Sequence, residues 1–185
     1  MKTIIAILYA HLVKRQNKKW IDNPIKWQAN TFQKLIKNGI KTEFGKNHDF
    51  ENIESYEQYK EKVPVRDYEE LRPYIEKVVN GEKDILWPGK PLYFAKTSGT
   101  TSGAKYIPIT KESIKTHIRS ARDALLNYFL KTKNFKPLNG KHMFLQGSPE
   151  LDKKQGIYHG RLSGISAHYV PKLFLRNRKP SWTTN

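Results

Sequence analysis

Nine consecutive residues, Thr97 to Lys105, carry the clearest chemical signal in this sequence. They include five hydroxyl side chains, two glycines and one lysine. Backbone N–H groups and hydroxyl donors in such a stretch can converge on an anion, and glycines let the main chain approach it closely. Lys105 adds a mobile positive charge. The stretch therefore predicts a phosphate-binding loop, whose binding residues are Thr97, Ser98, Gly99, Thr100, Thr101, Ser102 and Gly103.

The segments on either side indicate how this loop is held. Apolar runs at 92–95 and 106–109 favour two strands, so the anion would rest on a backbone nest and not on a helix N-terminus. The spacing differs from the Walker A pattern, because three residues separate the glycines and Ala104 precedes the lysine. The alternative interpretation is an ordinary hairpin tip, since Gly, Ser and Thr also dominate turns.

The sequence from Tyr93 to Thr110 resembles the first nucleotide motif of the adenylate-forming superfamily. Within that superfamily it is most similar to the Gretchen Hagen auxin-responsive promoter family of acyl-acid amido synthetases, in its bacterial form. Members of that family are much longer, so the resemblance is to an N-terminal fragment only. The stretches that support it are 42–45, 63–65, 68–75, 80–82, 147–150 and 162–166.

The resemblance implies an ATP-dependent ligase. A small carboxylic acid would attack the α-phosphorus of MgATP, and an amine or amino acid would then displace AMP. Thr97 to Ser102 would hold the β and γ phosphates, and Lys105 would be the catalytic residue that stabilises charge as pyrophosphate leaves. ATP and Mg are thus the implied cofactors. The later motifs of the family have no counterpart in this sequence, so the chain alone is expected to be inactive.

The expected fold class is α/β, with a helical N-terminal region leading into the start of an adenylate-forming large domain. Residues 1–90 are predicted to form the helical region and residues 91–185 the truncated nucleotide-binding core. Helix signals include the apolar spacing from Trp27 to Ile36, followed by Asn38-Gly39 as a left-handed cap. Further signals are a capping box from Ser55 to Gln58, a turn capped by Asp67 through Arg72, and a helix from Pro73 to Val79 ended by Asn80-Gly81.

A helix of about twenty residues is predicted after Thr110, which would be its N-cap. Arg119 and Arg122 fall off its expected apolar stripe, and one of them could bind a substrate carboxylate, because a planar guanidinium matches carboxylate geometry. The alternative is a pair of solvated surface arginines. The predicted buried stripe consists of Ile114, Ile118, Ala121 and Leu125.

Two predictions concern the region after this helix. Residues His142 to Leu145 read as a buried strand that ends in a tight turn at 147–150. Ligands sit beyond the carboxyl ends of strands in open α/β sheets, so this turn either faces a nucleotide crevice or is purely structural. Residues 162–167 are predicted to form a small-residue bend.

The net charge of +17 invites a nucleic-acid interpretation, so its distribution matters. Residues 1–20 carry five basic and no acidic side chains, residues 21–130 carry 18 and 15, and residues 131–185 carry 11 and two. The excess charge lies at the two ends and does not explain the loop. A non-catalytic polyanion-binding protein and an inactive truncated fragment remain the alternatives, but nucleic acid is not the favoured partner.

The remaining composition narrows the chemistry. The absence of cysteine excludes disulfides and thiolate catalysis, and the six histidines lack ligand spacing, so no metal site is predicted on the chain itself. The apolar run at 3–10 is short and lacks a cleavage site, which favours an opening helix over a signal peptide. No stretch approaches the ~20 apolar residues of a membrane span, so a cytoplasmic protein with no membrane partner is expected.

Overall fold

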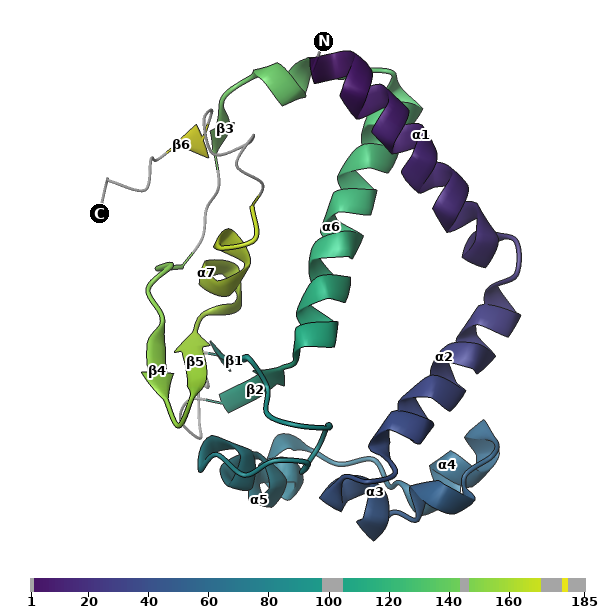
Figure 1. Cartoon of the computed structure of the whole chain (residues 1–185), viewed down its shortest axis with the longest axis vertical. Coiled ribbons are helices and arrows are strands. Elements are labelled where there is room, and N and C mark those ends of the chain that lie inside the picture. The colour runs from purple at the N-terminus through teal and green to yellow at the C-terminus, as the bar shows by residue number, and fades with distance from the viewer. Residues whose placement is uncertain (1, 98–104, 144–146, 171–177, 180–185) are drawn as a thin grey trace. The chain divides into compact units, whose positions relative to one another are not determined.

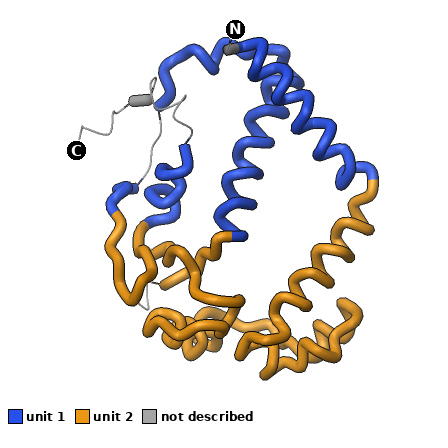
Figure 2. The backbone as a smooth tube through the Cα atoms, in the orientation of Figure 1, with its two compact units in different colours: residues 1–22, 112–150, 161–185 blue, residues 23–111, 151–160 orange. Residues whose placement is uncertain are grey.

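The computed structural model describes residues 2–97, 105–143, 147–170 and 178–179 (Figure 1). This part of the chain is mostly helical with a small mixed sheet, which confirms the predicted α/β class. The chain forms two compact units that alternate along the sequence, as the two colours in Figure 2 show. The first unit contains residues 1–22, 112–150 and 161–185, and the second contains residues 23–111 and 151–160.

The second unit opens with a series of helices. A capping box starts α4, as predicted, because Ser55 Oγ accepts a hydrogen bond from the Gln58 N–H while the Gln58 side chain accepts one from the Ser55 N–H. The helices of this region are α2 (Pro24–Gly39), α3 (Glu43–Asn47), the 3-10 turn η1 (Phe50–Asn52), α4 (Tyr56–Lys62) and α5 (Tyr68–Val79).

Helix α2 ends at Gly39, but the predicted left-handed cap is wrong. The next residue, Ile40, has the right-handed helical conformation, and Gly39 itself has no positive φ. Gly39 serves close packing instead: an added Cβ would lie 2.8 Å from the ring of Phe50. A Cβ on Gly45 would similarly lie 2.0 Å from the Gly39 carbonyl oxygen. The two glycines therefore let α2, α3 and η1 approach closely.

Helix α5 begins earlier than predicted. The Asp67 side chain accepts a hydrogen bond from the Glu70 N–H, and the Glu70 carboxylate accepts one from the Asp67 N–H, so this capping box starts the helix at Tyr68. Pro73 consequently lies inside the helix and not at its start. The helix ends at Val79, as predicted, and Gly81 adopts a φ of +90° just beyond it.

The second unit also holds a four-stranded sheet with strand order β2-β1-β5-β4. Strands β1 (Tyr93–Thr97) and β2 (Lys105–Ile109) are antiparallel, which confirms the two strands predicted around the loop. Strand β5 (Ile157–Gly160) runs parallel to β1 and antiparallel to β4 (Asp152–Lys154). The turn between β4 and β5 has positive φ at both Gln155 and Gly156, as a type I′ hairpin requires.

One face of this sheet packs against α5. Phe94 of β1 and Ile157 of β5 are fully buried, and they form a cluster with Val78 of α5 and with Ile85. Phe94, Lys96 and His159 share this face, because side chains alternate along β1 and Phe94 lies directly opposite His159. The packing therefore fixes the start of α5 near the end of the sheet where the predicted loop emerges.

The first unit pairs two long helices, α1 (Lys2–Ile21) and α6 (Lys111–Thr132). The opening helix is thus confirmed, and α6 begins directly after Thr110. The predicted stripe is wrong in its second half, because Ala121 and Leu125 are exposed. The face of α6 that is turned inward contains Ile114 and the half-buried Ile118, followed by Leu126 and Phe129, which pack against α1. Arg122 is half-buried on the same face. The α1–α6 core consists of Ala10, Val13, Leu126 and Phe129.

The rest of the first unit corrects two further predictions. The strand β3 (His142–Met143) pairs in parallel with β6 (Arg178–Lys179), and Met143 is 77% exposed and not buried; Phe144 and Leu145 lie outside the described residues. Residues 162–167 form a helix, α7 (Leu162–Ala167), where a bend was predicted. Gly164 permits this packing, because a Cβ there would lie 2.1 Å from the Ser148 carbonyl oxygen. A short 3-10 turn, η2 (Lys136–Asn139), follows α6.

Candidate functional site

The predicted phosphate loop joins the ends of two paired strands. Thr97 is the last residue of β1 and Lys105 the first residue of β2, and the two lie directly opposite each other. Thr97 is exposed and Lys105 is half-buried. The remaining predicted binding residues, Ser98, Gly99, Thr100, Thr101, Ser102 and Gly103, lie outside the described residues. The structure thus brings the first and last members of the predicted loop together at its mouth.

Lys105 lies against an aromatic ring from α5. Its Nζ atom is 5.2 Å from the ring centroid of Tyr68, a cation–π distance. The guanidinium carbon of Arg72 lies 5.9 Å from the same ring, but Arg72 also pairs with Glu69 at 2.6 Å. No ion pair within the described ranges involves Lys105. Arg72 is therefore paired with a carboxylate, whereas Lys105 is not paired with one within these ranges.

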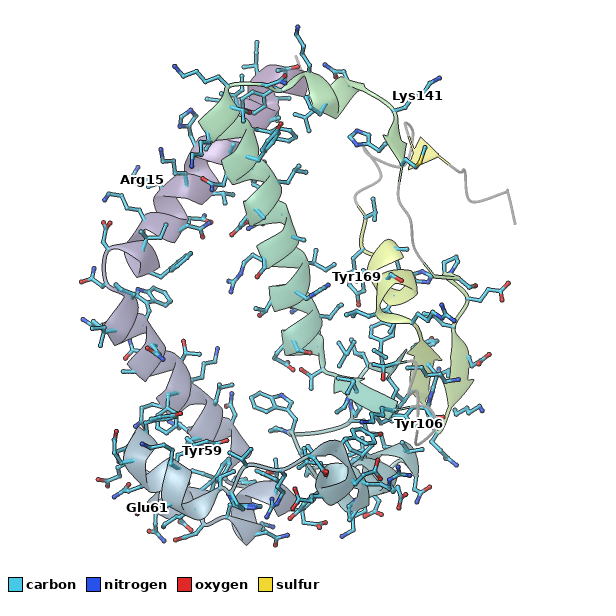
Figure 3. All side chains as sticks on the ribbon, turned by 180° about the vertical axis from the view of Figure 1, so that it is seen from behind. Arg15, Tyr59, Glu61, Tyr106, Lys141 and Tyr169 are labelled. Atoms are coloured by element: carbon cyan, nitrogen blue, oxygen red, sulfur yellow. The ribbon has the colours of Figure 1, made fainter. Side chains whose placement is uncertain are left out.

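Tyr68 also contacts the backbone of β2. Its hydroxyl oxygen accepts a hydrogen bond of 2.8 Å from the Tyr106 N–H (Tyr106 is labelled in Figure 3). Strand β2 lies at the edge of the sheet, and the Tyr106 N–H donates to Tyr68 of α5 on the side that faces away from β1. Pro108, two residues along the same edge, has no N–H to offer. The outer edge of β2 is therefore closed where it meets α5.

A pocket of about 240 Å³ lies between α5 and β2 within the second unit. Its lining combines a cation and a carboxylate, Arg72 and Glu76, with aromatic and aliphatic walls. Tyr68 lines this pocket and also contacts Lys105, so the pocket adjoins the mouth of the loop. The lining residues are Tyr68, Arg72, Ile75, Glu76, Val79, Asn80 and Tyr106.

Sequence reasoning did not identify Tyr68 as a functional residue. It lies in the stretch 68–75 that supported the family resemblance, directly after the capping residue Asp67. Nothing in the local pattern distinguishes a tyrosine that reaches another strand from a surface tyrosine on a helix. The capping box at Asp67 was the available signal, because it fixes which residue begins α5.

His159 is a buried polar residue in the same sheet. It is 3% exposed, lies 5.2 Å from the Phe94 ring and 5.7 Å from the Tyr106 ring, and neither of its nitrogens has a hydrogen-bond partner in the described part of the chain. Burial lowers the pKa of His159 below its usual 6.5, and the charges of Lys96 and Lys154 lower it further, against the opposite effect of Asp152. Each of the dominant effects therefore favours the uncharged form of the imidazole.

Arg122, a candidate for substrate binding, is engaged within the first unit. Its Nε donates to Asp123 at 2.8 Å and its Nη1 donates to the Tyr9 hydroxyl at 2.8 Å. Asp123 accepts a further hydrogen bond from Asn17. Burial lowers the pKa of Arg122, but the hydrogen bond and charge of Asp123 outweigh it, so the net pKa is raised. Arg119 is exposed on α6.

The turn at 147–150 is tied to α7. The Gly147 N–H donates to Ser163 Oγ at 2.9 Å, and the Pro149 carbonyl lies 2.7 Å from His168 Nε2. With the close approach of Gly164 to Ser148, these contacts give the turn a structural function. Its position beside a nucleotide stays a prediction.

The described ranges also bear on metal binding and membrane insertion. These ranges hold no group of three or more His, Asp or Glu side chains that could bind a metal ion without other ligands. None of their helices is both long enough and apolar enough to span a membrane.

Comparison with known proteins identifies the family. Residues 13–181 match the family described as the GH3 family N-terminal domain. The chain belongs to the GH3 family. This is the Gretchen Hagen family of acyl-acid amido synthetases, so the resemblance seen at 93–110 is confirmed. The match covers both strands of the hairpin and the helix α5 that contacts it.

Individual GH3 relatives are plant enzymes. The chain is 25% identical over 138 residues to jasmonoyl–L-amino acid synthetase JAR4 of Nicotiana attenuata, covering 73% of this chain and 23% of that protein. It is 27% identical over 138 residues to indole-3-acetic acid-amido synthetase GH3.2 of Arabidopsis thaliana, covering 74% and 22% respectively. The solved structure of the GH3.15 acyl acid amido synthetase matches with a TM-score of 0.68 at 23% identity, covering 88% of this chain and 28% of that one, which shows a shared fold. The GH3 chain thus spans about a quarter of the length of these relatives.

Proposed function

We propose that this chain is the N-terminal part of an ATP-dependent ligase that adenylates a carboxylic acid and conjugates it to an amine or amino acid. The observation that carries the proposal is the β1–β2 hairpin in a GH3-family chain. Its strands end at the facing residues Thr97 and Lys105, and Lys105 has no carboxylate partner within the described ranges. A cation of this kind beside a hydroxyl-rich loop suits a polyphosphate.

In the first step a carboxylate oxygen of the acid forms a bond to the α-phosphorus of ATP, and the bond from that phosphorus to the bridging oxygen of pyrophosphate breaks. The acid needs no general base, because a carboxylate is already ionised at neutral pH. Residues Thr97 to Gly103 bind the β and γ phosphates through N–H and hydroxyl donors. Lys105 compensates the negative charge that develops on the departing pyrophosphate.

Mg²⁺ would be held mainly by the phosphates of the bound nucleotide, and it would supply positive charge that reduces repulsion between the phosphates and the incoming carboxylate. Mg²⁺ is commonly held by substrate phosphates and waters with only one or two carboxylates.

In the second step the acceptor amine forms a bond to the acyl carbon, AMP leaves, and the nitrogen loses a proton to solvent or a base. Before the first step, while the acid is still a free carboxylate, Arg119 or Arg122 of α6 binds it. Arg119 is exposed, whereas Arg122 would have to exchange its contacts with Asp123 and Tyr9 for the substrate. The names of the relatives guide the choice of substrates, which include jasmonate, indole-3-acetate and 4-substituted benzoates with amino acids such as glutamate.

The test is pyrophosphate exchange into ATP by the full-length protein that contains this chain, measured with each acid of this panel. We expect exchange that depends on a carboxylic acid, and amide formation when amino acids are added. ATP hydrolysis without exchange, independent of every acid in the panel, would overturn the proposal. Ser98→Ala and Thr100→Ala should each slow the exchange, because each removes a donor to a charged oxygen, while thermal unfolding stays as in the unmodified protein.

A further inference from the structure

Tyr68 joins α5 to the mouth of the loop through both ends of its side chain. The hydroxyl oxygen accepts the Tyr106 N–H at 2.8 Å, and the ring faces the Lys105 ammonium group at 5.2 Å. The half-buried side chain of Tyr68 therefore contacts both the backbone of Tyr106 and the charged group of Lys105.

The position of Tyr68 is itself fixed. It is the first residue of α5, and the reciprocal hydrogen bonds between Asp67 and Glu70 fix where that helix starts. Helix α5 is held on the sheet by the cluster that joins Val78 to Phe94 and Ile157. Tyr68 thus transmits the placement of a packed helix to the first two residues of β2.

The ring gives Lys105 a favoured position without neutralising it. A carboxylate partner would cancel the charge that a phosphate needs, as Glu69 does for Arg72 at 2.6 Å. The face of an aromatic ring attracts a cation but carries no net charge. Lys105 is therefore held in place and still available to an anion.

From these contacts we infer that Tyr68 is the positioning residue for Lys105: its ring holds the ammonium group of the first residue of β2, and its hydroxyl fixes the strand that carries it. This inference rests on the proposed function for its effect on catalysis. Tyr68 belongs to α5 and lies outside the loop, so the loop sequence does not reveal it. In the proposed reaction it acts through Lys105, which compensates the charge on the departing pyrophosphate.

The activity test is a double-mutant cycle in the full-length protein, read as kcat and KM for MgATP in acid-dependent pyrophosphate exchange. Y68L should lower kcat by about fivefold in the otherwise unmodified protein, from the loss of a cation–π contact, and by less than about twofold when Lys105 is already alanine. Y68F, which keeps the ring, should lose less than Y68L. An equal loss from Y68L in both backgrounds would overturn the inference, because it would show that Tyr68 does not act through Lys105.

A matched control comes from α4, where Lys60 Nζ lies 5.3 Å from the ring centroid of Tyr56 and the tyrosine is 58% exposed. Y56L removes an equivalent cation–ring contact away from the loop, and should leave the cycle with Lys105 unaffected. If Y56L lowers kcat as much as Y68L, the effect of Tyr68 is not specific and the inference fails.

A second measurement does not depend on catalysis. In the full-length protein labelled with ¹³C at the lysine ε carbon, the Lys105 ε-methylene protons should be shifted by the ring current of Tyr68; K105R assigns the signal. The shift should persist in Y68F and disappear in Y68L. An unchanged Lys105 signal in Y68L would overturn the inference even if the proposed ligase function fails, whereas a lost shift with no exchange activity would refute the function alone.

Discussion

Arg122 and Lys105 are two of the cations that contact tyrosine rings in the described part of the chain, yet their surroundings differ. Arg122 of α6 lies 5.6 Å from the Tyr9 ring centroid and also bonds Asp123, which Asn17 holds in turn. Lys105 of β2 lies 5.2 Å from the Tyr68 ring and has no carboxylate partner within the described ranges. The arginine thus completes a structural network in the first unit, while the charge of the lysine in the second unit is not matched by a carboxylate within those ranges, as the proposed phosphate binding requires.

This difference helps to separate structural cations from functional ones. A charge that is already matched adds to folding, and moving it to a substrate requires breaking the contacts that match it. A cation held by a neutral ring contributes less to folding than a cation paired with a carboxylate. It can contribute more to binding an anion, because no carboxylate has to be displaced. Substitution of Lys105 should therefore affect activity more than stability, and substitution of Arg122 should affect stability more than activity.

The largest effect is expected from Lys105→Ala in the full-length protein. If the amine faces a phosphate oxygen as pyrophosphate leaves, its loss should lower kcat for exchange about 10- to 100-fold, because hydrogen bonds to charged groups contribute about 1.5–3 kcal/mol. Lys153→Ala is the matched control, since Lys153 lies 5.1 Å from the Tyr158 ring in the same sheet but away from the loop. Equal activity of the two variants would remove Lys105 from the site.

A smaller effect, on stability, is expected from Arg122→Leu. The substitution leaves Asp123, whose side chain is 17% exposed, with Asn17 as its remaining partner. Because Arg122 is itself partly solvated, we expect a loss of about 1 kcal/mol in the free energy of unfolding, measured by denaturant titration. Lys105→Ala should change this free energy by less, and if it destabilises the protein as much as Arg122→Leu, the distinction between the two cations is wrong.

The smallest effect is expected on the pH dependence of stability, through the protonation of the buried His159. Because burial lowers the pKa of His159, the unfolded chain takes up a proton at higher pH than the folded one. The contribution of neutral His159 to stability should be complete above pH 6.5 and decrease as the pH falls from 6.5 toward the lowered pKa. His159→Phe should remove this part of the acid sensitivity, whereas His11→Gln, on the exposed surface of α1, should not. Parallel pH curves for the unmodified protein and His159→Phe would contradict the argument.

The sequence predicted those features of the fold that depend on neighbouring residues. The capping box at Ser55, the end of α5 at Asn80-Gly81, the opening helix and the two strands beside the loop were predicted, and the structure confirms them. Each is determined by local hydrogen bonding or by the φ preference of one residue.

Features that depend on distant packing were not predictable in the same way. The α6 stripe was misplaced because Ala10 and Val13 of α1 select the residues that it buries. Gly39 and Gly164 read as turn residues, but they permit close contact with Phe50 and Ser148. At the candidate site, Thr97 and Lys105 were named from sequence, whereas the contact of Tyr68 with Lys105 spans 37 residues along the chain and has no local signature.

The parallel pairing of β1 with β5 has a consequence for how this chain folds. The β1–β2 and β4–β5 hairpins each join strands that are close in sequence, but Tyr93 and Tyr158 are paired across 65 residues that include the whole of α6. Closing so long a loop costs entropy before any contact compensates it. The hairpins should therefore gain protection from hydrogen exchange early in refolding and the Tyr158 N–H, which bonds the Leu92 carbonyl, late. During synthesis, β1 must wait for its neighbour until about 60 further residues have emerged, so the exposed edge of β1 is the point at which a nascent chain would be most open to wrong strand pairing.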